Sequence, residues 1–232
     1  QGDRIRQSVR VRTTAVATRA AERNELRLGR VTKTVLPPIG FCSEPNQQPP
    51  SDEVVRLLQT VAPDHIRTEL DLRGDGWRGA LSDARDFSHR LGCPLELAVF
   101  ADGSSISRLD ELSAVLRRVP LSRVLVFAAA GRSETVTETT PSGIMAHARA
   151  ALHAGGVEAP VGGGTDMYFA ELNRTPPDAG LMDCVAFAVV PQVHVEDDLS
   201  LFETLEAQED AVRSGLAISR GRPLVVVLGA GG

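Results

Sequence analysis

Short apolar segments alternate with longer amphipathic segments along most of the chain. A short apolar run between turn residues predicts a buried strand, and an apolar face that recurs every three to four residues predicts a helix. We expect strands at residues 34–39, 65–72, 94–101, 123–129, 159–163, 184–190 and 223–228. We expect helices after the capping residue Ser51 and at residues 77–91, 108–118, 144–153 and 199–220.

This order of elements constrains the fold class. Strands that alternate with helices form parallel βαβ units. Seven such units in sequence favour a (β/α)8 barrel of the α/β class over an open doubly wound sheet, which remains the alternative. A closed barrel of this kind has eight strands, and no eighth strand is visible after Leu228. We therefore predict an incomplete TIM-like barrel over residues 31–232, with seven strands visible.

The first 30 residues follow a different pattern. Ile5, Val9 and Val11 alternate with polar residues in the segment RIRQSVRVR. This alternation predicts a half-exposed β-strand. We interpret residues 1–30 as this strand followed by a polar connector.

Composition and charge argue against several classes of protein. The net charge of −5 and the lack of a Lys/Arg block are unlike a nucleic-acid-binding protein. No stretch approaches the roughly 18 apolar residues of a membrane helix, and the polar N-terminus is unlike a signal peptide. The three cysteines, Cys42, Cys93 and Cys184, do not make a disulfide framework. We expect a cytoplasmic protein with no nucleic-acid or membrane partner, and the sequence leaves its oligomeric state unknown.

The predicted strand at residues 65–72 separates apolar from charged side chains. Ile66, Leu70 and Leu72 fall on one side. The other side carries the charged residues Arg67, Glu69, Asp71 and Arg73. Because the outer face of a barrel packs against helices, we expect the charged side to point inward. The same alternation in the predicted strand at residues 94–101 directs Leu95, Leu97 and Val99 outward and Glu96, Phe100 and Asp102 inward. Two interpretations stay open: a structural ladder of ion pairs, or a site in which Glu69 or Asp71 is a catalytic base and Arg73 binds substrate.

Polar residues also end two other predicted strands. Asp102 follows the strand at residues 94–101, where it either contacts a ligand or forms the turn before Gly103. Gln192, His194 and Glu196 follow the strand at residues 184–190. A histidine at a strand end, beside an amide and acids, is a candidate base, with a structural role as the alternative. We interpret His194 as a candidate catalytic residue and the other three as candidate substrate-binding residues.

The segment PVGGGTDMYFAELNR is the most unusual in the chain. Three glycines at a strand end allow the backbone to approach a ligand closely. The polar residues after them are candidate substrate-binding groups: Thr165, Asp166, Tyr168 and Asn173. The alternative is a helix cap formed by Thr165 and Asp166, with aromatic residues packed beneath it. The segment is neither a phosphate loop nor a dinucleotide fingerprint, because the required lysine and third glycine are missing.

Several other chemistries lack the residues that they need. The chain has no G-x-S-x-G elbow. Its only lysine, Lys33, precedes the first barrel strand and so cannot form a strand-end Schiff base. The sequence contains no H-x-H or H-E-x-x-H zinc pattern. We therefore predict neither a metal ion nor a cofactor.

Two long segments, PVGGGTDMYFAELNRTPP and PQVHVEDDLSLFETLEAQEDAVRSGLAISRGRPL, carry a family resemblance. They resemble the D-apionate lactonase family, most strongly over residues 160–224 and more weakly from Val35 onward. The resemblance implies a bacterial hydrolase of apiose catabolism that opens a five-carbon sugar lactone to its aldonate. It also implies a barrel related to retaining glycosidases with β-sandwich segments at its edges, of which the strand near Ile5 would be a remnant. The positions that match the family's motifs are Gly163, Gly164, Thr165, Tyr168, Glu171, Asn173, Arg174, Gln192, His194, Glu203, Thr204 and Glu206.

The resemblance to glycosidases is incomplete at two strand ends. A related glycosidase would have an Asn-Glu pair at the fourth strand and a Glu at the seventh. Here the fourth strand is followed by AAAGRSE, so Glu134 is the candidate catalytic acid, and the seventh ends in VVVLGAGG without an acid. A retaining glycosidase needs two carboxylates about 5 Å apart. Lactone hydrolysis is therefore our leading prediction, and a glycoside hydrolase or a non-catalytic sugar-binding domain remain alternatives; each would bind a small sugar or sugar lactone.

Overall fold

A sheet of seven parallel strands forms the framework of the protein, in a computed structural model that describes residues 29–30, 33–43, 50–129, 139–190 and 197–228. The chain divides into two units, Gln1–Leu36 and Pro37–Gly232. The strands and helices given below all belong to the second unit. The strand predicted near Ile5 lies outside the described residues, so that strand and the domain boundary after residue 30 remain predictions.

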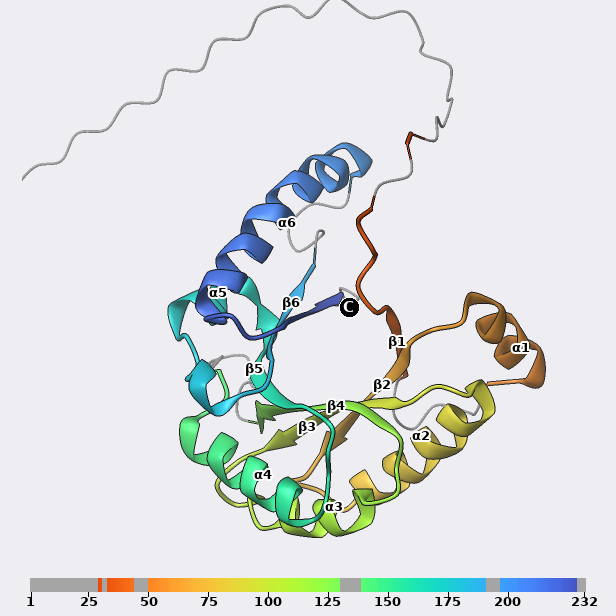
Figure 1. Ribbon diagram of the computed structural model, residues 1–232, viewed down its shortest axis with the longest axis vertical. Coiled ribbons are helices and arrows are strands. Elements are labelled where there is room, and N and C mark those ends of the chain that lie inside the picture. Colours follow the sequence, from red (N-terminus) through yellow and green to blue (C-terminus); the bar gives the residue numbers. More distant parts are fainter. Residues whose placement is uncertain (1–28, 31–32, 44–49, 130–138, 191–196, 229–232) are drawn as a thin grey trace, which may run out of the picture. The chain divides into compact units, whose positions relative to one another are not determined.

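Each strand of the sheet pairs in parallel with the next strand in the sequence. The strands are β1 (Gly40–Ser43), β2 (His65–Asp71), β3 (Leu95–Ala101), β4 (Leu121–Ala128), β5 (Val161–Tyr168), β6 (Val185–Val189) and β7 (Leu224–Leu228). Their order across the sheet is β1-β2-β3-β4-β5-β6-β7. Figure 1 shows this sheet curving inside a layer of helices, with β1 and β7 at its two edges. The sequential order confirms the predicted barrel architecture, because a doubly wound sheet reverses its strand order.

Helices connect successive strands and cover the outer face of the sheet. They are α1 (Asp52–Val61), α2 (Trp77–Leu91), α3 (Arg108–Leu116), α4 (Ser142–Ala154), α5 (Phe169–Arg174) and α6 (Asp198–Ile218), with a short 3-10 helix at Ala179–Leu181. Ser51 caps α1 as predicted, since its Oγ accepts a hydrogen bond of 3.3 Å from the backbone N–H of Val54. The sequence did not predict α5, because six residues are too few to show a helical period. Within the described ranges, none of the helices has the length and apolar character needed to cross a membrane.

The predicted position of the first strand was wrong. We expected a strand at residues 34–39, whereas residues 34–39 have no regular structure and β1 begins at Gly40. Pro37 and Pro38 have no backbone N–H to donate to a neighbouring strand, so strand pairing begins only beyond them. The paired residues start with Gly40 opposite His65. The backbone of Ile39 is instead fixed by Asp64, whose carboxylate accepts a hydrogen bond of 2.8 Å from the Ile39 N–H.

The sheet buries an apolar cluster on each face. The outer cluster joins alternate strand residues to the helices and includes Ile66, Leu70, Leu95, Leu97, Val99, Trp77, Leu81, Leu109 and Leu112. The inner cluster consists of Ala98, Phe100, Leu125, Phe127, Ala129, Cys184, Ala186 and Val225. The rings of Phe100 and Phe127 lie 5.6 Å apart between their centroids. The predicted inward and outward faces of β2 and β3 are therefore confirmed, and charged groups on the inward side lie in the barrel interior.

The three consecutive glycines allow β5 to pack closely against its neighbours. A Cβ atom at Gly162 would lie 2.3 Å from Cys184 Sγ, and one at Gly164 would lie 2.2 Å from the Ala186 carbonyl oxygen. Gly164 also has a φ of +134°, which L-amino acids rarely adopt. Thr140 holds the other side of β5: its N–H donates to the Gly164 carbonyl at 2.7 Å, and its Oγ1 accepts from the Gly164 N–H at 3.0 Å. Packing between strands thus accounts for glycines that we had interpreted as space for a ligand.

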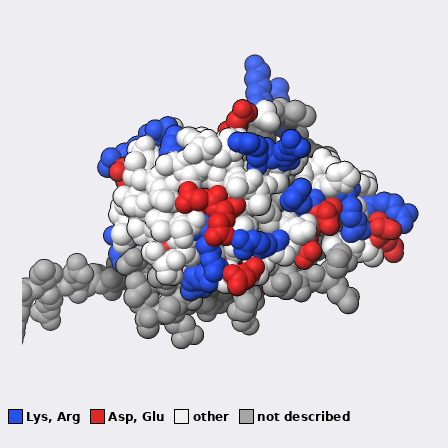
Figure 2. Space-filling model, turned by 90° about the horizontal axis from the view of Figure 1, so that it is seen from below, with Lys and Arg blue, Asp and Glu red and all other residues white. Residues whose placement is uncertain are grey.

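Exposed charges on the helices are paired across neighbouring elements. Arg78 of α2 forms an ion pair with Glu111 of α3, and His147 of α4 lies 3.3 Å from the carboxylate of Asp110. Figure 2 shows acidic and basic side chains interspersed on the face of the molecule that it displays. Exposed pairs of this kind contribute about 1 kcal/mol or less each to stability.

Replacing Gly164 with alanine should strongly destabilise the fold. The new Cβ would collide with the Ala186 carbonyl and require an unfavourable φ. We expect the free energy of unfolding, measured by urea denaturation, to fall by about 2–3 kcal/mol. The control is Gly79→Ala in α2, where a Cβ meets nothing within 4 Å; this change should raise stability by about 0.5–1 kcal/mol. Equal effects of the two substitutions would contradict the packing explanation for β5.

Candidate active site

Buried charged side chains cross the interior of the barrel. Arg67 of β2 donates a hydrogen bond of 2.9 Å from Nη1 to Glu96 Oε1 on β3. Its Nη2 donates a second bond of 3.0 Å to Asp166 Oδ1 on β5. The side chains of Arg67 and Glu96 are only 5% and 2% exposed. Such burial of ions requires close partners. Arg67 therefore links β2 to β3 and to β5, and β5 is adjacent to neither of the other two strands.

The carboxylate of Glu96 is the centre of this interior network. Its Oε2 lies 3.1 Å from Arg123 Nε on β4 and 3.4 Å from His65 Nε2 on β2. The guanidinium carbon of Arg67 lies 5.5 Å from the ring centroid of Phe127, within range of a cation–π interaction. Of the two interpretations of the inward charges, ion pairing thus describes Arg67, although its partners are on other strands rather than on its own.

At the carboxyl end of β2, Asp71 and Arg73 form a second, more exposed ion pair. Arg73 Nη2 donates to Asp71 Oδ2 at 2.7 Å, and Arg73 Nε donates to Asp71 Oδ1 at 3.0 Å. The side chain of Arg73 is 43% exposed and that of Asp71 is 38% exposed. The hydrogen bond that Arg73 donates to Asp71 raises the pKa of Arg73, and the negative charges of Asp71 and Asp102 add to this effect. A guanidinium held at the rim of the barrel by Asp71 can bind a polar or anionic group.

Asp102 has a local structural role at the end of β3. Its Oδ1 accepts hydrogen bonds from the N–H of Ser104 at 2.9 Å and of Ser105 at 3.0 Å, and also from the hydroxyls of both serines. These bonds, those with Ser104 above all, lower the pKa of Asp102. This is the turn-forming alternative that the sequence left open; a ligand-binding role for Asp102 remains a prediction.

The candidate residues on β5 and α5 are arranged around a local irregularity of the strand. Thr165 is buried and its Oγ1 accepts a hydrogen bond of 3.0 Å from the Met167 N–H. This is a turn inside the strand and differs from the helix cap that was our alternative, since the residue at the start of α5 is Tyr168 and makes no side-chain cap. Asp166 binds Arg67, Tyr168 is half-buried, and Asn173 is exposed on α5.

Four predicted site residues lie outside the described residues: Glu134, Gln192, His194 and Glu196. Their roles stay predictions. The structure places Glu69, Asp71, Arg73, Asp102 and Asp166 on the inner face or at the carboxyl end of β2, β3 or β5, and it joins Asp71 to Arg73 directly. Carboxyl ends of barrel strands are where barrel enzymes hold their active sites.

Sequence analysis missed three members of the interior network: His65, Glu96 and Arg123. Glu96 was recognised as facing inward but was not connected to a partner. The signal for Arg123 was present, because it lies two and four residues before the inward-facing Leu125 and Phe127. Identifying the ion pairs also requires the alignment of adjacent strands, which places Arg67 opposite Glu96 and Glu96 opposite Arg123.

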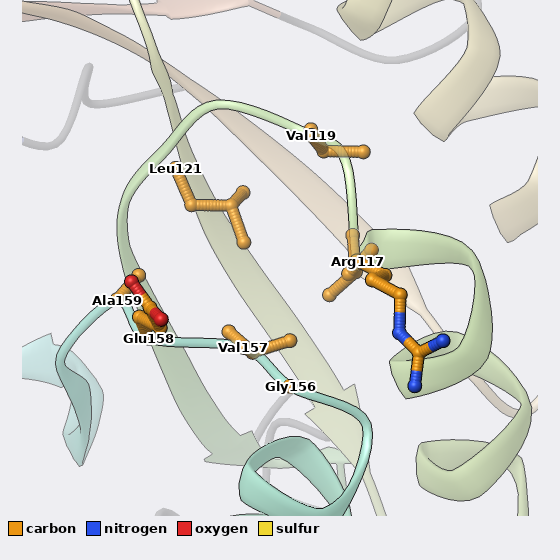
Figure 3. A pocket seen from close by; sticks show the side chains of 8 residues that line it. Arg117, Val119, Leu121, Gly156, Val157, Glu158 and Ala159 are labelled. Atoms are coloured by element: carbon orange, nitrogen blue, oxygen red, sulfur yellow. The ribbon is translucent and has the colours of Figure 1, made fainter.

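A cavity of about 350 Å³ lies at the other end of the sheet, before the first residues of β4 and β5. Figure 3 shows the apolar side chains of Val119, Leu121 and Val157 in its lining, with Arg117 and Glu158 to either side. The amino-terminal end of a barrel generally serves stability. None of the predicted site residues that the structure describes lines this cavity, so the candidate active site remains at the carboxyl ends.

A comparison with known protein families shows to which family this chain belongs. The family model for the TIM barrel domain of D-apionate lactonase matches residues 39–229. The chain belongs to the D-apionate lactonase family. A curated relative, D-apionate lactonase from Brucella anthropi, is 30% identical over 202 residues, which make up 83% of this chain and 32% of the relative. The chain therefore spans about a third of the length of this relative. The family match confirms both the predicted family and the predicted barrel.

Among solved structures, the chain is similar to β-glucuronidase from Ruminococcus gnavus. The complex of that enzyme with D-glucaro-d-lactam gives a TM-score of 0.49 and 12% identity, covering 83% of this chain and 34% of the other. The complex with D-glucaro 1,5-lactone gives a TM-score of 0.48 and 12% identity, covering 83% and 35%. At these values the likeness carries no argument about the function of this chain.

His65 should make stability depend on pH. Burial lowers the pKa of His65, and the charge of Glu96 opposes this effect only in part. Because the folded pKa is below the ordinary value of about 6.5, the unfolded chain takes up a proton first as the pH falls. The stability that neutral His65 contributes is thus present above about pH 6.5 and is lost as the pH falls through the folded pKa. We expect the urea midpoint of the parent protein to drop more steeply from about pH 7 to about pH 5 than that of His65→Gln.

The matched control is His89→Gln, which changes an exposed histidine at the end of α2. This variant should keep the pH dependence of the parent. If His65→Gln also keeps the parent's slope, His65 is not the group responsible, and the buried environment described above would not control its protonation.

Proposed function

We propose that the protein hydrolyses a sugar lactone, of the D-apionolactone type, at the carboxyl ends of β2, β3 and β5. Membership of the D-apionate lactonase family carries this proposal. The arrangement of the strand ends supports it, since Glu69, Asp71 and Arg73 provide two carboxylates and a guanidinium within one strand and its end. Hydrolysis of an ester needs a base for water and a cation or hydrogen-bond donor for the oxyanion.

Glu69 is our proposed general base. It lies on the same inward face of β2 as Asp71, two residues earlier in the strand, and is half-buried. Asp71 has a different role in this proposal, because both of its oxygens accept hydrogen bonds from Arg73. In this proposal Glu69 takes a proton from water, whose oxygen attacks the lactone carbonyl carbon. The ring C–O bond then breaks, and the departing oxygen takes the proton that Glu69 received from water, which gives the hydroxy acid and restores the Glu69 carboxylate.

Arg73 is the proposed electrophilic group, with Asp71 as the residue that orients it. A guanidinium held through Nε and Nη2 presents its remaining N–H groups in a fixed direction. Charge stabilisation by fixed donors requires no rearrangement during the reaction. The proposed substrate-binding groups are Asp102, Thr165, Asp166, Tyr168 and Asn173, together with Gln192 and Glu196 from the sequence prediction. His194 and Glu134 keep the catalytic role that the sequence predicts for them.

The cellular setting is also a proposal. Cys42, Cys93 and Cys184 are all free thiols. Burial raises the pKa of Cys184 to about 11 and also raises the pKa of Cys42, so both thiols favour the protonated, unreactive form. Unpaired cysteines support a reducing compartment. We propose that the protein acts in the bacterial cytoplasm, in the breakdown of apiose or a similar branched sugar.

Replacing Glu69 with glutamine should remove most of the hydrolytic activity. The amide keeps the shape of the side chain and cannot accept a proton, so we expect kcat to fall by about 100-fold or more with D-apionolactone. Acid release in a pH-stat, corrected for spontaneous hydrolysis, measures the rate. Glu111→Gln, the same chemical change on the exposed side of α3, should leave the rate unchanged.

Two outcomes would contradict parts of this proposal. If Glu69→Gln retains its activity and Asp71→Asn loses it, the base is Asp71. If the parent protein releases no acid above the spontaneous rate from D-apionolactone or related pentonolactones, lactone hydrolysis is not the activity of this chain.

A further inference from the structure

A bulge in β5 brings Asp166 to the interior of the barrel. Gly164 pairs with Ala186 of β6, and the pairing of the two strands resumes at Tyr168, opposite Ala188. Over this interval β5 advances four residues while β6 advances two. Bulges of this kind are common beside active sites, where they change the direction of a side chain. Here the irregular segment contains Asp166, and the turn that Thr165 makes with the Met167 N–H closes it on one side.

The side chain of Arg67 ties the irregular segment to a distant strand of the sheet. Arg67 extends from β2 to bind Asp166 Oδ1 at 3.0 Å, although β3 and β4 separate these two strands in the sheet. The other end of the guanidinium is held by Glu96 at 2.9 Å, and its face lies over Phe127. Asp166 is therefore bound by a buried group that is itself held by Glu96 and lies over Phe127.

Burial decreases steadily from Glu96 towards the carboxyl ends of the strands. The exposed fraction of the side chain is 2% for Glu96, 5% for Arg67, 24% for Asp166 and 38% for Asp71. Arg67 is thus too deeply buried to contact a ligand at the rim, whereas the carboxylate of Asp166 is partly accessible. An effect of Arg67 on a bound ligand would have to pass through Asp166.

We propose that Arg67 is a positioning residue of the active site: it holds Asp166 and the β5 bulge so that the carboxylate accepts hydrogen bonds from hydroxyl groups of the sugar lactone. This inference rests on the proposed function. Lysine cannot replace arginine in this role, because its single ammonium group lacks the planar fork that binds Glu96 and Asp166 at the same time. Arg67 would therefore be required for its geometry as well as for its charge.

The first test measures the bulge itself and needs no ligand. Arg67→Met removes the guanidinium while keeping an apolar stem over Phe127. We expect amide hydrogen exchange at residues 166–168 to become at least about 10-fold faster than in the parent, with a much smaller change at residues 161–163 of the same strand. Arg149→Met is the matched control, since Arg149 also forms a partly buried ion pair, 2.7 Å from Asp183, on α4 at the outside of the sheet. It should leave exchange at residues 166–168 unchanged.

The second test is a double-mutant cycle on lactone hydrolysis, with each variant verified as folded by circular dichroism. If Arg67 acts through Asp166, then Arg67→Met and Asp166→Asn should reduce kcat/KM by similar factors, up to about 100-fold. The double variant should be no worse than either single variant. Arg67→Lys should recover the urea midpoint in part without recovering kcat/KM, which a merely structural role would not predict.

The outcomes separate this inference from the proposed function. Unchanged exchange at residues 166–168 in Arg67→Met overturns the positioning role, whatever the activity. Losses in kcat/KM that multiply in the double variant also overturn it, because they show independent action. If the parent protein does not hydrolyse lactones but exchange rises only in the bulge, the proposed function fails and the control of the bulge by Arg67 stands.

Discussion

The charged side chains inside the barrel have little access to water, so they must form ion pairs and hydrogen bonds with one another. Much of the structure depends on this requirement. Arg67 and Arg123 contribute positive charge, and Glu96 and Asp166 contribute negative charge, within a few ångströms. An isolated ion at such a position is strongly unfavourable, whereas a set of opposite charges at hydrogen-bonding distance is tolerated. Because the partners come from β2, β3, β4 and β5, the pairing also fixes how these four strands align with one another.

Sequence periodicity predicted the strands and helices well because each has one face that must be apolar. Leu95, Leu97 and Val99 recur at every second position, and their outward direction follows directly from packing against helices. The same reasoning placed β1 too early, since Val35 and Leu36 look like strand residues and only the two prolines that follow prevent pairing. The helix α5 was missed because it is too short to show a period.

The candidate site was predicted less completely than the fold. The direction of Glu69, Asp71 and Arg73 could be inferred from alternation, but the contact between Arg67 and Asp166 could not. Those two residues are 99 positions apart, and their meeting depends on the curvature of the sheet and on a bulge. The bulge begins beside Gly164, where a positive φ and the approach of Ala186 leave space only for glycine. A linear pattern contains no measure of such curvature.

The two edges of the sheet have consequences for how the protein behaves outside its own fold. Among the described strands, β1 and β7 each have a strand neighbour on one side only. Nearby apolar side chains are exposed as well: Phe41 of β1, Val226 of β7, and Leu199 and Phe202 at the start of α6. Strand edges next to apolar surface are templates for pairing with other chains. Solubility at high protein concentration therefore depends on how these edges are covered, a property separate from the chemistry of the strand ends.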